Sequence, residues 1–368
     1  MNGLNNLTHK IKYLKEVIMK NILENENYLE DLQLVANKFD FNDLKNKSIL
    51  IPGGMGLIGS AVVDLIYALN TFKDFNTQIY IASRDLDEFS ERYQGVKNIT
   101  FVEYDALKSV EFDFPVDYIV YCVGIASPQL YVEKPVETIK TSVWGIDAIV
   151  KYAIEKKVKR VLYVSSSEVY GVKSDLDSFV EDKYGVISLD NVRLSYAVGK
   201  VASELLCRSY YCEYGLDYVV VRPGHIFGPT ATKNDKKISS EFAYLSAYGK
   251  QLILKSAGLQ KRSYCYSLDC AVAILIALLH GSCGEAYNIG HDEVTSIREM
   301  AQYMAEAGSV ELIVGEPSEK ELMAFNPMNN SCLNINKIKN IGFRNSFSVR
   351  DACDHTVKII KNINLLNQ

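Results

Sequence analysis

The chain has 368 residues with a formal net charge of −5, and 48% of its residues are hydrophobic. This length supplies one large or two modest domains with a full core, while the mild acidity provides no basic face for a nucleic acid. The longest apolar run, CAVAILIALL at 270–279, reaches about half the length of a membrane span. The composition therefore predicts a soluble protein whose partners are neither nucleic acid nor membrane.

Residues 1–46 are rich in Asn, Lys and Glu, and apolar side chains recur there at helical spacing at Leu14, Val17, Ile18 and Ile22. The spacing predicts an N-terminal extension of one or two amphipathic helices. Their apolar faces are expected to pack on the main body or on a partner.

Between residues 47 and 228, short apolar runs alternate with helical stretches. Strands that are apolar throughout and separated by helices indicate a doubly wound parallel sheet covered on both faces. The expected strands are 48–54, 78–84, 99–105, 116–124, 160–167 and 217–224, and the clearest helices are 57–70, 136–157 and 194–214.

The pattern changes in residues 229–368, which predict a smaller α/β lobe laid over the edge of the sheet where its strands end. This lobe is expected to bind substrate. Its predicted helices lie near 239–249, 268–280 and 296–307, and its short strands near 252–255, 285–289 and 311–314.

A glycine-rich loop, ILIPGGMGLIGS, follows the first strand and contains Gly53, Gly56 and Gly59. Glycines between a strand and a helix allow the backbone to approach a pyrophosphate, whose charge meets the N–H groups of the helix N-terminus. We therefore predict a dinucleotide site here, with Leu57 and Ile58 at the helix start among its contacts. The alternative is a tight turn with close helix–strand packing.

The end of the second strand is expected to meet the adenosine ribose. Ser83 and Arg84 stand there, and a hydroxyl and a guanidinium suit a 2′-phosphate better than the acidic residue that typically binds NAD. The prediction is NAD or NADP with a tilt to NADP, the alternative being that Arg84 stacks on adenine or faces water. Asp105 and Ala106, at the end of the third strand, are the expected adenine contacts, although Asp105 could also be a solvated carboxylate.

The segment SYAVGK places Tyr196 and Lys200 four residues apart, on one helical face. A phenol with a pKa of ~10 is a weak base at neutral pH, but a neighbouring ammonium and a positively charged nicotinamide favour the phenolate. Such a tyrosine can remove a proton from a sugar hydroxyl while hydride leaves the same carbon.

Together these motifs resemble the extended short-chain dehydrogenases/reductases of the NAD-dependent epimerase/dehydratase family, which act on nucleotide sugars. The likeness runs from about residue 47 to 362 and includes GGMGLIGS, SSSEVYG, SYAVGK, RPGHIFGP and EAYNIG. It implies a Rossmann-type fold in which Ser166 bonds the sugar oxygen at carbon 4 and Tyr196 is the base. Lys200 would also hold the nicotinamide ribose.

The resemblance also gives a meaning to SSSEVYG, because Ser167 and Glu168 stand where sugar dehydratases and decarboxylases keep additional acid/base groups. A 4,6-dehydratase needs a carboxylate to remove the proton at carbon 5 as the carbon-6 hydroxyl leaves, so we expect this reaction. The alternatives are a UDP-glucuronate decarboxylase, a nucleotide-sugar 4-epimerase and an NADPH-dependent 4-ketoreductase. Outside enzymes, a non-catalytic cofactor-binding protein remains, with Glu168 as a salt-bridged strand end.

Substrate contacts are implied at three positions. Arg262 matches the family arginine that contacts the substrate phosphate, and His225 replaces an Asn that approaches the diphosphate. His225 could equally pack against Tyr or Phe, and Arg262 could belong to a solvated charge pair. Ser127 opens the SPQLY loop that borders the sugar pocket. Asp269 is expected to cap its own helix.

The family is usually dimeric through two helices that match 136–157 and 194–214. The aromatic Trp144 and Tyr152 on the first of these fit a homodimer. Eight cysteines show no CxxC pair and no metal-ligand spacing with the five histidines, and the N-terminus shows no secretory signal. Reduced, mostly buried thiols, no metal site and a cytoplasmic location are therefore expected.

Overall fold

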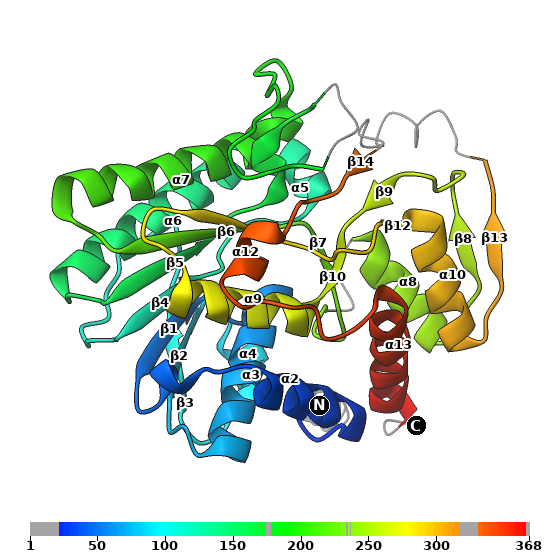
Figure 1. Ribbon diagram of the computed structural model, residues 1–368, viewed down its shortest axis with the longest axis horizontal. Coiled ribbons are helices and arrows are strands. Elements are labelled where there is room, and N and C mark those ends of the chain that lie inside the picture. Colours follow the sequence, from blue (N-terminus) through cyan, green and yellow to red (C-terminus); the bar gives the residue numbers. More distant parts are fainter. Residues whose placement is uncertain (1–21, 174–177, 233–234, 236, 317–329, 366–368) are drawn as a thin grey trace, which may run out of the picture.

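The protein is built around a seven-stranded, fully parallel sheet (Figure 1). The computed structural model describes residues 22–173, 178–232, 235, 237–316 and 330–365. Leu14, Val17 and Ile18 of the predicted N-terminal helices lie outside the described residues. In spatial order the strands are β11 (Ala286–Ile289), β6 (Tyr218–Pro223), β5 (Arg160–Val164), β4 (Tyr118–Tyr121), β1 (Ser48–Pro52), β2 (Gln78–Ser83) and β3 (Ile99–Glu103).

The six strands predicted for the main domain are all present, and the sheet gains a seventh that the sequence analysis had assigned to the lobe. That assignment of 285–289 is wrong, because β11 pairs with β6 in parallel register, with Tyr287 opposite Val221. A parallel strand needs a long crossover connection, and the 62 residues 224–285, which include a returning helix, supply it. Consecutive side chains of β1 point to opposite faces, as a strand requires: Leu50 belongs to one core cluster and Ile51 to the other.

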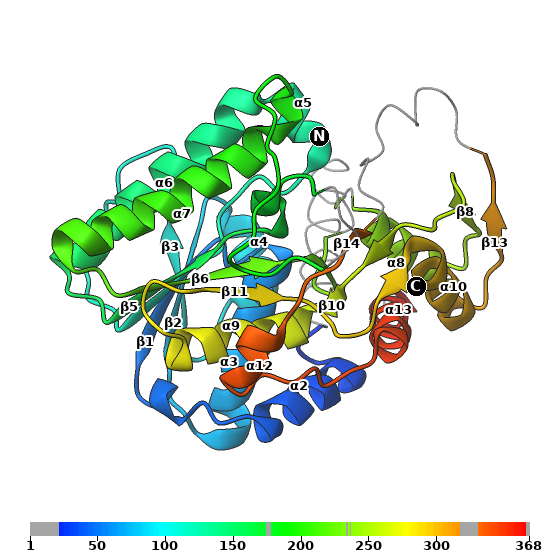
Figure 2. The same ribbon diagram turned by 45° about the horizontal axis from the view of Figure 1, so that its top comes forward.

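Helices cover both faces of the sheet, as the apolar strands predicted. On one face, α6 and α7 lie side by side (Figures 1 and 2). Gly199 allows them to pack closely, since a Cβ at this position would lie only 3.1 Å from the Ser142 side chain. The helices of this face are α5 (Pro128–Glu133), α6 (Pro135–Glu155) and α7 (Ser195–Tyr214); those of the other are α2 (Glu26–Lys38), α3 (Leu57–Lys73), α4 (Leu86–Tyr93) and α9 (Ser267–His280).

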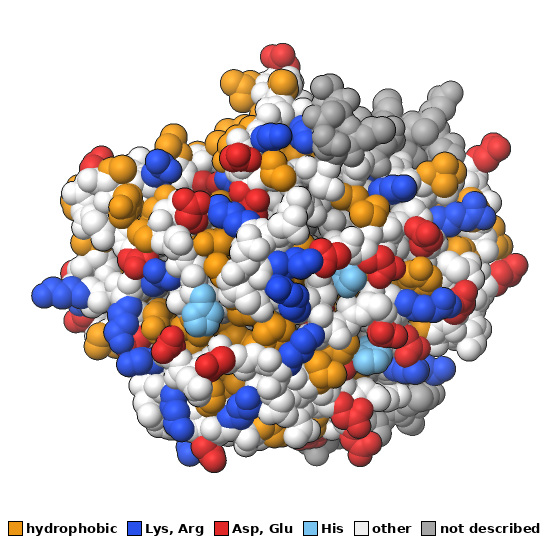
Figure 3. Space-filling view, in the orientation of Figure 1, with side chains coloured by type: hydrophobic (Ala, Val, Ile, Leu, Met, Phe, Trp, Pro, Cys, Tyr) orange, Lys and Arg blue, Asp and Glu red, His pale blue; other side chains and the backbone are white. Residues whose placement is uncertain are grey.

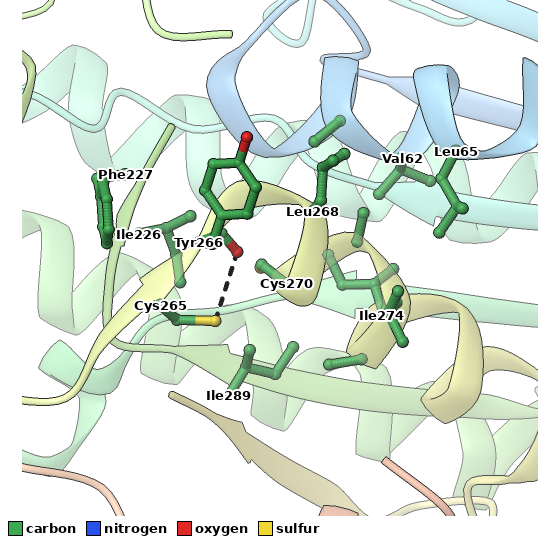
Figure 4. Packing of buried hydrophobic residues seen from close by; sticks show 14 of the residues in the cluster. Val62, Leu65, Ile226, Phe227, Cys265, Tyr266, Leu268, Cys270, Ile274 and Ile289 are labelled. Atoms are coloured by element: carbon green, nitrogen blue, oxygen red, sulfur yellow. Dashed lines mark hydrogen bonds between the residues drawn. The ribbon is translucent and has the colours of Figure 1, made fainter. Parts of the chain in front are cut away.

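The C-terminal lobe stands beyond the carboxyl ends of the strands (Figure 1). Figure 4 shows packing at the junction, where Ile226 and Phe227 of the lobe belong to the same core cluster as Leu268 and Ile274 of α9. The lobe contains the helices α8 (Ile238–Ala247), α10 (Ile297–Gly308), α12 (Asn336–Asn340) and α13 (Val349–Leu365), and the strands β7 (His225–Phe227), β8 (Leu252–Leu254), β9 (Lys261–Arg262), β10 (Tyr264–Tyr266), β12 (Thr295–Ser296), β13 (Leu312–Val314) and β14 (Asn330–Ser331).

The described part of the N-terminal extension packs on the main body. Helix α2 contacts α3, α9 and α13, and two buried carboxylates fix it there. The Tyr28 hydroxyl donates to Asp64 of α3 at 2.8 Å, and Tyr266 donates to Asp31 of α2 at 2.9 Å. His355 of α13 bonds the other oxygen of Asp31 at 2.8 Å. For α2, the prediction that the N-terminal extension packs on the main body is therefore confirmed.

One residue named for the dimer surface does not reach the surface. Tyr152 is only 5% exposed, packs edge-on against Phe112 and donates its hydroxyl to the Phe114 carbonyl. The expectation for Tyr152 is wrong because the loop 109–114 covers this side of α6. Trp144, in contrast, is 51% exposed.

The surface mixes charges of both signs. On the face shown in Figure 3, Lys and Arg side chains are interspersed with Asp and Glu. Among the described helices, none combines the length and the apolar character that crossing a membrane requires.

Candidate active site

A cavity of about 320 Å³ opens at the carboxyl ends of β1, β2 and β4. The chain leaves β3 and returns to β4 on the other side of β1, so this is the topological switch point where ligands bind in open α/β sheets. The lining includes most of the residues predicted for the dinucleotide, namely Gly53, Gly56, Ser83, Arg84, Asp105 and Ala106.

The glycine loop has the geometry that a pyrophosphate site needs. Gly53 has φ +79°, and a Cβ there would lie 2.9 Å from the Cys122 backbone. A Cβ on Gly59 would lie 2.2 Å from the Gly53 carbonyl oxygen, so α3 can press against the loop only through glycine. Gly56 lines the cavity at the N-cap of α3, where the first N–H groups of the helix have no intrahelical partner. The loop therefore fits a dinucleotide phosphate.

The end of this cavity predicted to meet the adenosine holds polar groups that already have backbone partners. The Ser83 hydroxyl accepts from the Asp85 N–H at 3.3 Å, and Asp105 accepts from the Leu107 N–H at 3.0 Å. Arg84 is exposed at the rim. Glu88 also lines the cavity, and burial raises its pKa.

A second cavity of about 370 Å³ lies between the sheet and the lobe. The structure brings Ser166, Ser167, Glu168 and Tyr196 together on its wall, along with the predicted substrate residues His225 and Arg262. Leu57 and Ile58, predicted to contact the dinucleotide, line this cavity instead, at the start of α3 between the two spaces. Ser127 itself is not on the wall, although its neighbours Ala126 and Pro128 are.

Lys200 is buried behind Tyr196. Its ammonium donates to the Val164 carbonyl at 2.8 Å and the Val123 carbonyl at 3.4 Å, and it lies 5.8 Å from the centre of the Tyr196 ring. Burial lowers the pKa of Lys200 to about 8. Burial also raises the pKa of Tyr196, the negative charge of Glu168 raises it further, and a hydrogen bond with Ser166 lowers it.

Two residues that the sequence analysis did not assign complete this end of the cavity. The Tyr131 ring of α5 stacks on the Tyr196 ring, with centres 4.6 Å apart and an interplanar angle of 4°. Arg193, in the 3₁₀ helix η3 (Val192–Leu194), lies next to Glu168, with Nη2 3.5 Å from Oε1. Burial raises the pKa of Glu168, and Arg193 opposes this shift. The sequence did contain a signal for Arg193, because it precedes Tyr196 by three residues, about one helical turn.

The far end of the cavity gathers basic side chains. Arg262, Lys237 and His225 line it, and burial followed by the charges of Arg262 and Lys237 lowers the pKa of His225 to about 3. The neutral imidazole packs edge-on against Tyr264, the packing alternative named for it. Within the described residues its Nδ1 has no hydrogen-bond partner.

Asp269 does not cap its own helix, so that expectation is wrong. The N-cap of α9 is Tyr266. Asp269 instead accepts hydrogen bonds from the backbone N–H groups of Ser346 at 2.9 Å and Phe347 at 3.4 Å, just before α13. Burial raises the pKa of Asp269 to about 6. In the described part of the chain, no group of three or more His, Cys, Asp or Glu is placed to hold a metal ion.

The glycine loop, the switch-point cavity and the buried Tyr–Lys pair define a dinucleotide-binding protein of the short-chain dehydrogenase/reductase type. Residues 49–290, more than half of the chain, match the model of the NAD dependent epimerase/dehydratase family. The protein belongs to this family.

Individual relatives agree with that assignment. UDP-glucuronic acid decarboxylase 1 of Xenopus tropicalis is 29% identical over 261 residues, which span 70% of this chain and 59% of that protein. Human dTDP-D-glucose 4,6-dehydratase is 27% identical over 285 residues, 75% of this chain and 77% of that protein. The chain thus spans less than two thirds of the decarboxylase and about three quarters of the dehydratase.

Solved structures establish the fold. The epimerase Mth375 of Methanothermobacter thermautotrophicus has a TM-score of 0.76 at 21% identity, covering 91% of this chain and 97% of that one. UDP-glucose 4-epimerase of Thermotoga maritima, solved with UDP-glucose, has a TM-score of 0.70 at 21% identity, with 86% and 99% covered.

Proposed function

We propose that this protein oxidises carbon 4 of a nucleotide-linked hexose transiently, uses the ketone for an elimination that involves carbons 5 and 6, and then returns the hydride to the sugar. After loss of water the hydride goes to carbon 6 and carbon 4 remains a ketone, whereas after loss of carbon dioxide the hydride goes back to carbon 4. The bound dinucleotide accepts and returns the hydride. The observation that supports this function is that the two cavities adjoin, since Gly56 and Ile125 line the first and their neighbours Leu57 and Ala126 line the second. Tyr196 lies on the wall of the second cavity, with Lys200 buried behind it. The lobe, which is mainly residues 229–368 without α9 and β11, would hold the sugar nucleotide over the sheet.

Each side chain at the reacting end has a role in this proposal. The Tyr196 oxygen takes the proton of the carbon-4 hydroxyl, and Ser166, which interacts with that oxygen, hydrogen-bonds the sugar oxygen as its charge changes. Lys200 supplies a buried positive charge that stabilises the phenolate. Glu168 removes the proton from carbon 5, which the adjacent ketone makes acidic, and Ser167 stands next to the leaving group. His225 and Arg262 would meet the diphosphate.

Elimination of water, the 4,6-dehydratase reaction, is the outcome that the sequence favours. Elimination of carbon dioxide is the second candidate, and the cation Arg193 beside Glu168 supports it, as does the likeness to the UDP-glucuronic acid decarboxylases. The presence of Glu168 on the cavity wall supports both over 4-epimerisation or 4-ketoreduction, which need no second base.

The dinucleotide is NAD or NADP. Gly53, Gly56, Gly59, Asp105 and Ala106 would contact either one. Ser83 and Arg84 support NADP, because both line the cavity where a 2′-phosphate would lie. Glu88 lines the same wall, and its carboxylate would repel a 2′-phosphate, which counts against NADP. Titrating the protein with each dinucleotide measures the preference directly.

We further propose that the protein is a cytoplasmic homodimer formed through α6 and α7. Trp144 on α6 and Leu205 on α7 support this, because they are 51% and 63% exposed, and large apolar side chains on neighbouring helices suit a covered interface. Replacing Trp144 with Glu should then shift the mass measured by light scattering from two chains to one. An unchanged mass in this variant would count against α6 as the interface.

The test of the main proposal is incubation with UDP-, dTDP-, GDP- and CDP-sugars, followed by mass spectrometry. Loss of water, loss of carbon dioxide and an unchanged mass with altered retention identify dehydration, decarboxylation and epimerisation. Tyr196→Phe should abolish every change and retain dinucleotide binding. If no sugar changes and Tyr196→Phe matches the wild type in all measurements, the protein is a non-catalytic binder.

A further inference from the structure

Three motif residues that the proposed function leaves without a role meet in one buried network. Tyr170 belongs to SSSEVYG, Arg222 to RPGHIFGP and Asn288 to EAYNIG. They come from the 3₁₀ helix η2 (Ser167–Tyr170), from β6 and from β11, and each is at most 2% exposed. They are not on the wall of the second cavity. Because buried polar side chains are almost always hydrogen-bonded, their partners show what the three residues hold in place.

The Arg222 guanidinium uses all five of its N–H groups. Nε and Nη2 donate to the two carboxylate oxygens of Glu204 at 3.0 and 2.7 Å, which is a bidentate pair. Nη1 donates to the Tyr170 hydroxyl at 3.1 Å and to the Glu181 carbonyl at 2.8 Å. Nη2 also donates to the Tyr184 hydroxyl at 2.6 Å. One side chain thus joins α7, the helix of the proposed catalytic tyrosine, to η2 and to the segment that contains Glu181 and Tyr184.

Tyr170 and Asn288 extend the network to the cavity wall. The Tyr170 hydroxyl donates to Asn288 Oδ1 at 2.6 Å, and Asn288 Nδ2 donates to the Phe179 carbonyl at 3.0 Å. The backbone N–H of Asn288 donates to the Glu181 carboxylate at 2.9 Å. The Tyr170 ring also stacks on the Phe179 ring, with centres 5.0 Å apart and an interplanar angle of 14°. Phe179 lines the second cavity, so the network supports this part of the wall.

The network also supports Glu168, which the sheet does not reach. The Ser165 N–H continues the pairing of β5 with β6, because it donates to the Val221 carbonyl at 2.8 Å. Ser166 therefore follows directly on a residue that the sheet holds. Glu168 lies further along, in the short helix η2, and Tyr170 is the last residue of this helix. The bonds of the Tyr170 hydroxyl therefore fix the helix and, with it, the Glu168 side chain.

We propose that Tyr170, Arg222 and Asn288 are positioning residues for the elimination step, because they hold Glu168 and Phe179 in the cavity wall. This inference rests on the proposed function, in which Glu168 acts after carbon 4 has been oxidised. Hydride transfer from carbon 4 does not need Glu168, so it should be nearly insensitive to the network. The elimination needs the Glu168 carboxyl at carbon 5, and a misplacement of about 1 Å can cost about 100-fold in rate.

The experiment follows both steps in the full-length protein, with a sugar nucleotide that the wild type converts. Tyr170→Phe keeps the stacked ring and removes only the hydroxyl, whereas Arg222→Lys keeps the positive charge beside Glu204 and removes the planar fork. Each of these two network variants should lower the rate of product formation about 10- to 100-fold and change KM less than about threefold. The rate at which the absorbance of reduced dinucleotide appears in a single turnover should change less than about threefold.

Matched control variants measure what the loss of comparable bonds does elsewhere. Arg160, at the opposite end of β5, pairs with Asp217 through Nε and Nη2 at 2.7 and 3.1 Å, so Arg160→Lys removes the same kind of bidentate pair. Tyr28→Phe removes a buried hydroxyl that donates to Asp64. Both controls should leave the two rates within about threefold of the wild type. If the controls lower product formation as much as the network variants do, or if the network variants slow hydride transfer equally, the network is only structural and the inference is overturned.

Amide hydrogen exchange tests the network independently of any reaction. Gly171 donates its N–H to the Glu168 carbonyl at 3.2 Å, and Gly185 donates its N–H to the Tyr170 carbonyl at 2.7 Å. Tyr170→Phe should speed the exchange of both amides about tenfold, and Tyr28→Phe should not. If the wild type converts no sugar nucleotide, the proposed catalysis fails, and faster exchange in Tyr170→Phe alone still supports the positioning of Glu168. Unchanged exchange of both amides in Tyr170→Phe overturns the inference whether or not a sugar reacts.

Discussion

Replacing Lys200 with Met should stabilise the dinucleotide-free protein at neutral pH, although it removes a group proposed for catalysis. Burial lowers the pKa of Lys200 from 10.5 to about 8. At about 1.4 kcal/mol per pKa unit, keeping this ammonium charged in the folded state costs about 3 kcal/mol at about pH 7. Methionine removes the charge, but it leaves the Val164 and Val123 carbonyls without their donor, which costs about 1 kcal/mol for each. The net gain is therefore about 1 kcal/mol.

The pH dependence of this gain is the sharper measurement. Because the folded pKa is below the unfolded one, the unfolded chain binds more protons between these two values, and wild-type stability rises with pH there. The charge penalty in the wild type falls by about 2 kcal/mol between about pH 7 and about pH 9.5, so the variant becomes the less stable protein. Urea unfolding across this pH range measures the difference in free energy of unfolding between Lys200→Met and the wild type. The exposed Lys250→Met serves as the control. A Lys200→Met difference that does not change with pH would refute the reasoning.

Three further changes test other parts of the structure. Tyr131→Leu should lower kcat about tenfold or more with KM little changed, because the stacked ring orients Tyr196; Tyr131→Phe keeps the ring and should restore kcat, and equal loss in both variants would exclude stacking as the cause. Arg84→Ala should raise the Kd for NADP about tenfold and leave that for NAD unchanged in fluorescence titrations; equal effects on both would place Arg84 outside the 2′-phosphate site. Tyr28→Phe should lower the free energy of unfolding by about 1–3 kcal/mol, because it leaves the buried Asp64 with one donor fewer; Tyr214→Phe on the exposed face is the control, and an equal small effect would show that the buried bond contributes nothing.

The fold was predictable because the strands are short apolar runs and the helices between them are amphipathic. The misassigned strand β11 shows where this reasoning ends. Its sequence, AYNI, is too short for hydrophobic periodicity to distinguish a central strand from a lobe strand. Only the pairing with β6, far away in sequence, places it in the sheet. Helix α13 was not among the helices predicted from the sequence. It nevertheless had a usable signal, since the buried residues Ala352, Cys353, Val357 and Ile360 repeat at helical spacing.

The site was predictable where a motif fixes local geometry and not where side chains meet across elements. Gly53 and Gly59 are constrained by the turn that contains them, and the sequence showed this. Tyr131 and Tyr196 are far apart in the sequence and stack where α5 meets the start of α7, next to the hydrogen bond that Ser195 donates to the Tyr131 carbonyl at 3.2 Å. For Arg193 the sequence offers only its position one helical turn before Tyr196, and its contact with Glu168 on the same cavity wall is seen only in the structure.

The electrostatics of Lys200 and Tyr196 argue that the two groups ionise together. Burial lowers the pKa of the lysine and raises that of the tyrosine, so each group alone prefers its neutral form. A phenolate beside an ammonium is an ion pair, and the attraction between its members is strong in a site from which water is excluded. Tyr196 therefore loses its own proton most readily when Lys200 is charged, and only the resulting phenolate can take the proton of a sugar hydroxyl. The same burial that makes Lys200 costly for folding thus makes its charge effective on Tyr196, and the stability gained by Lys200→Met should accompany the loss of turnover.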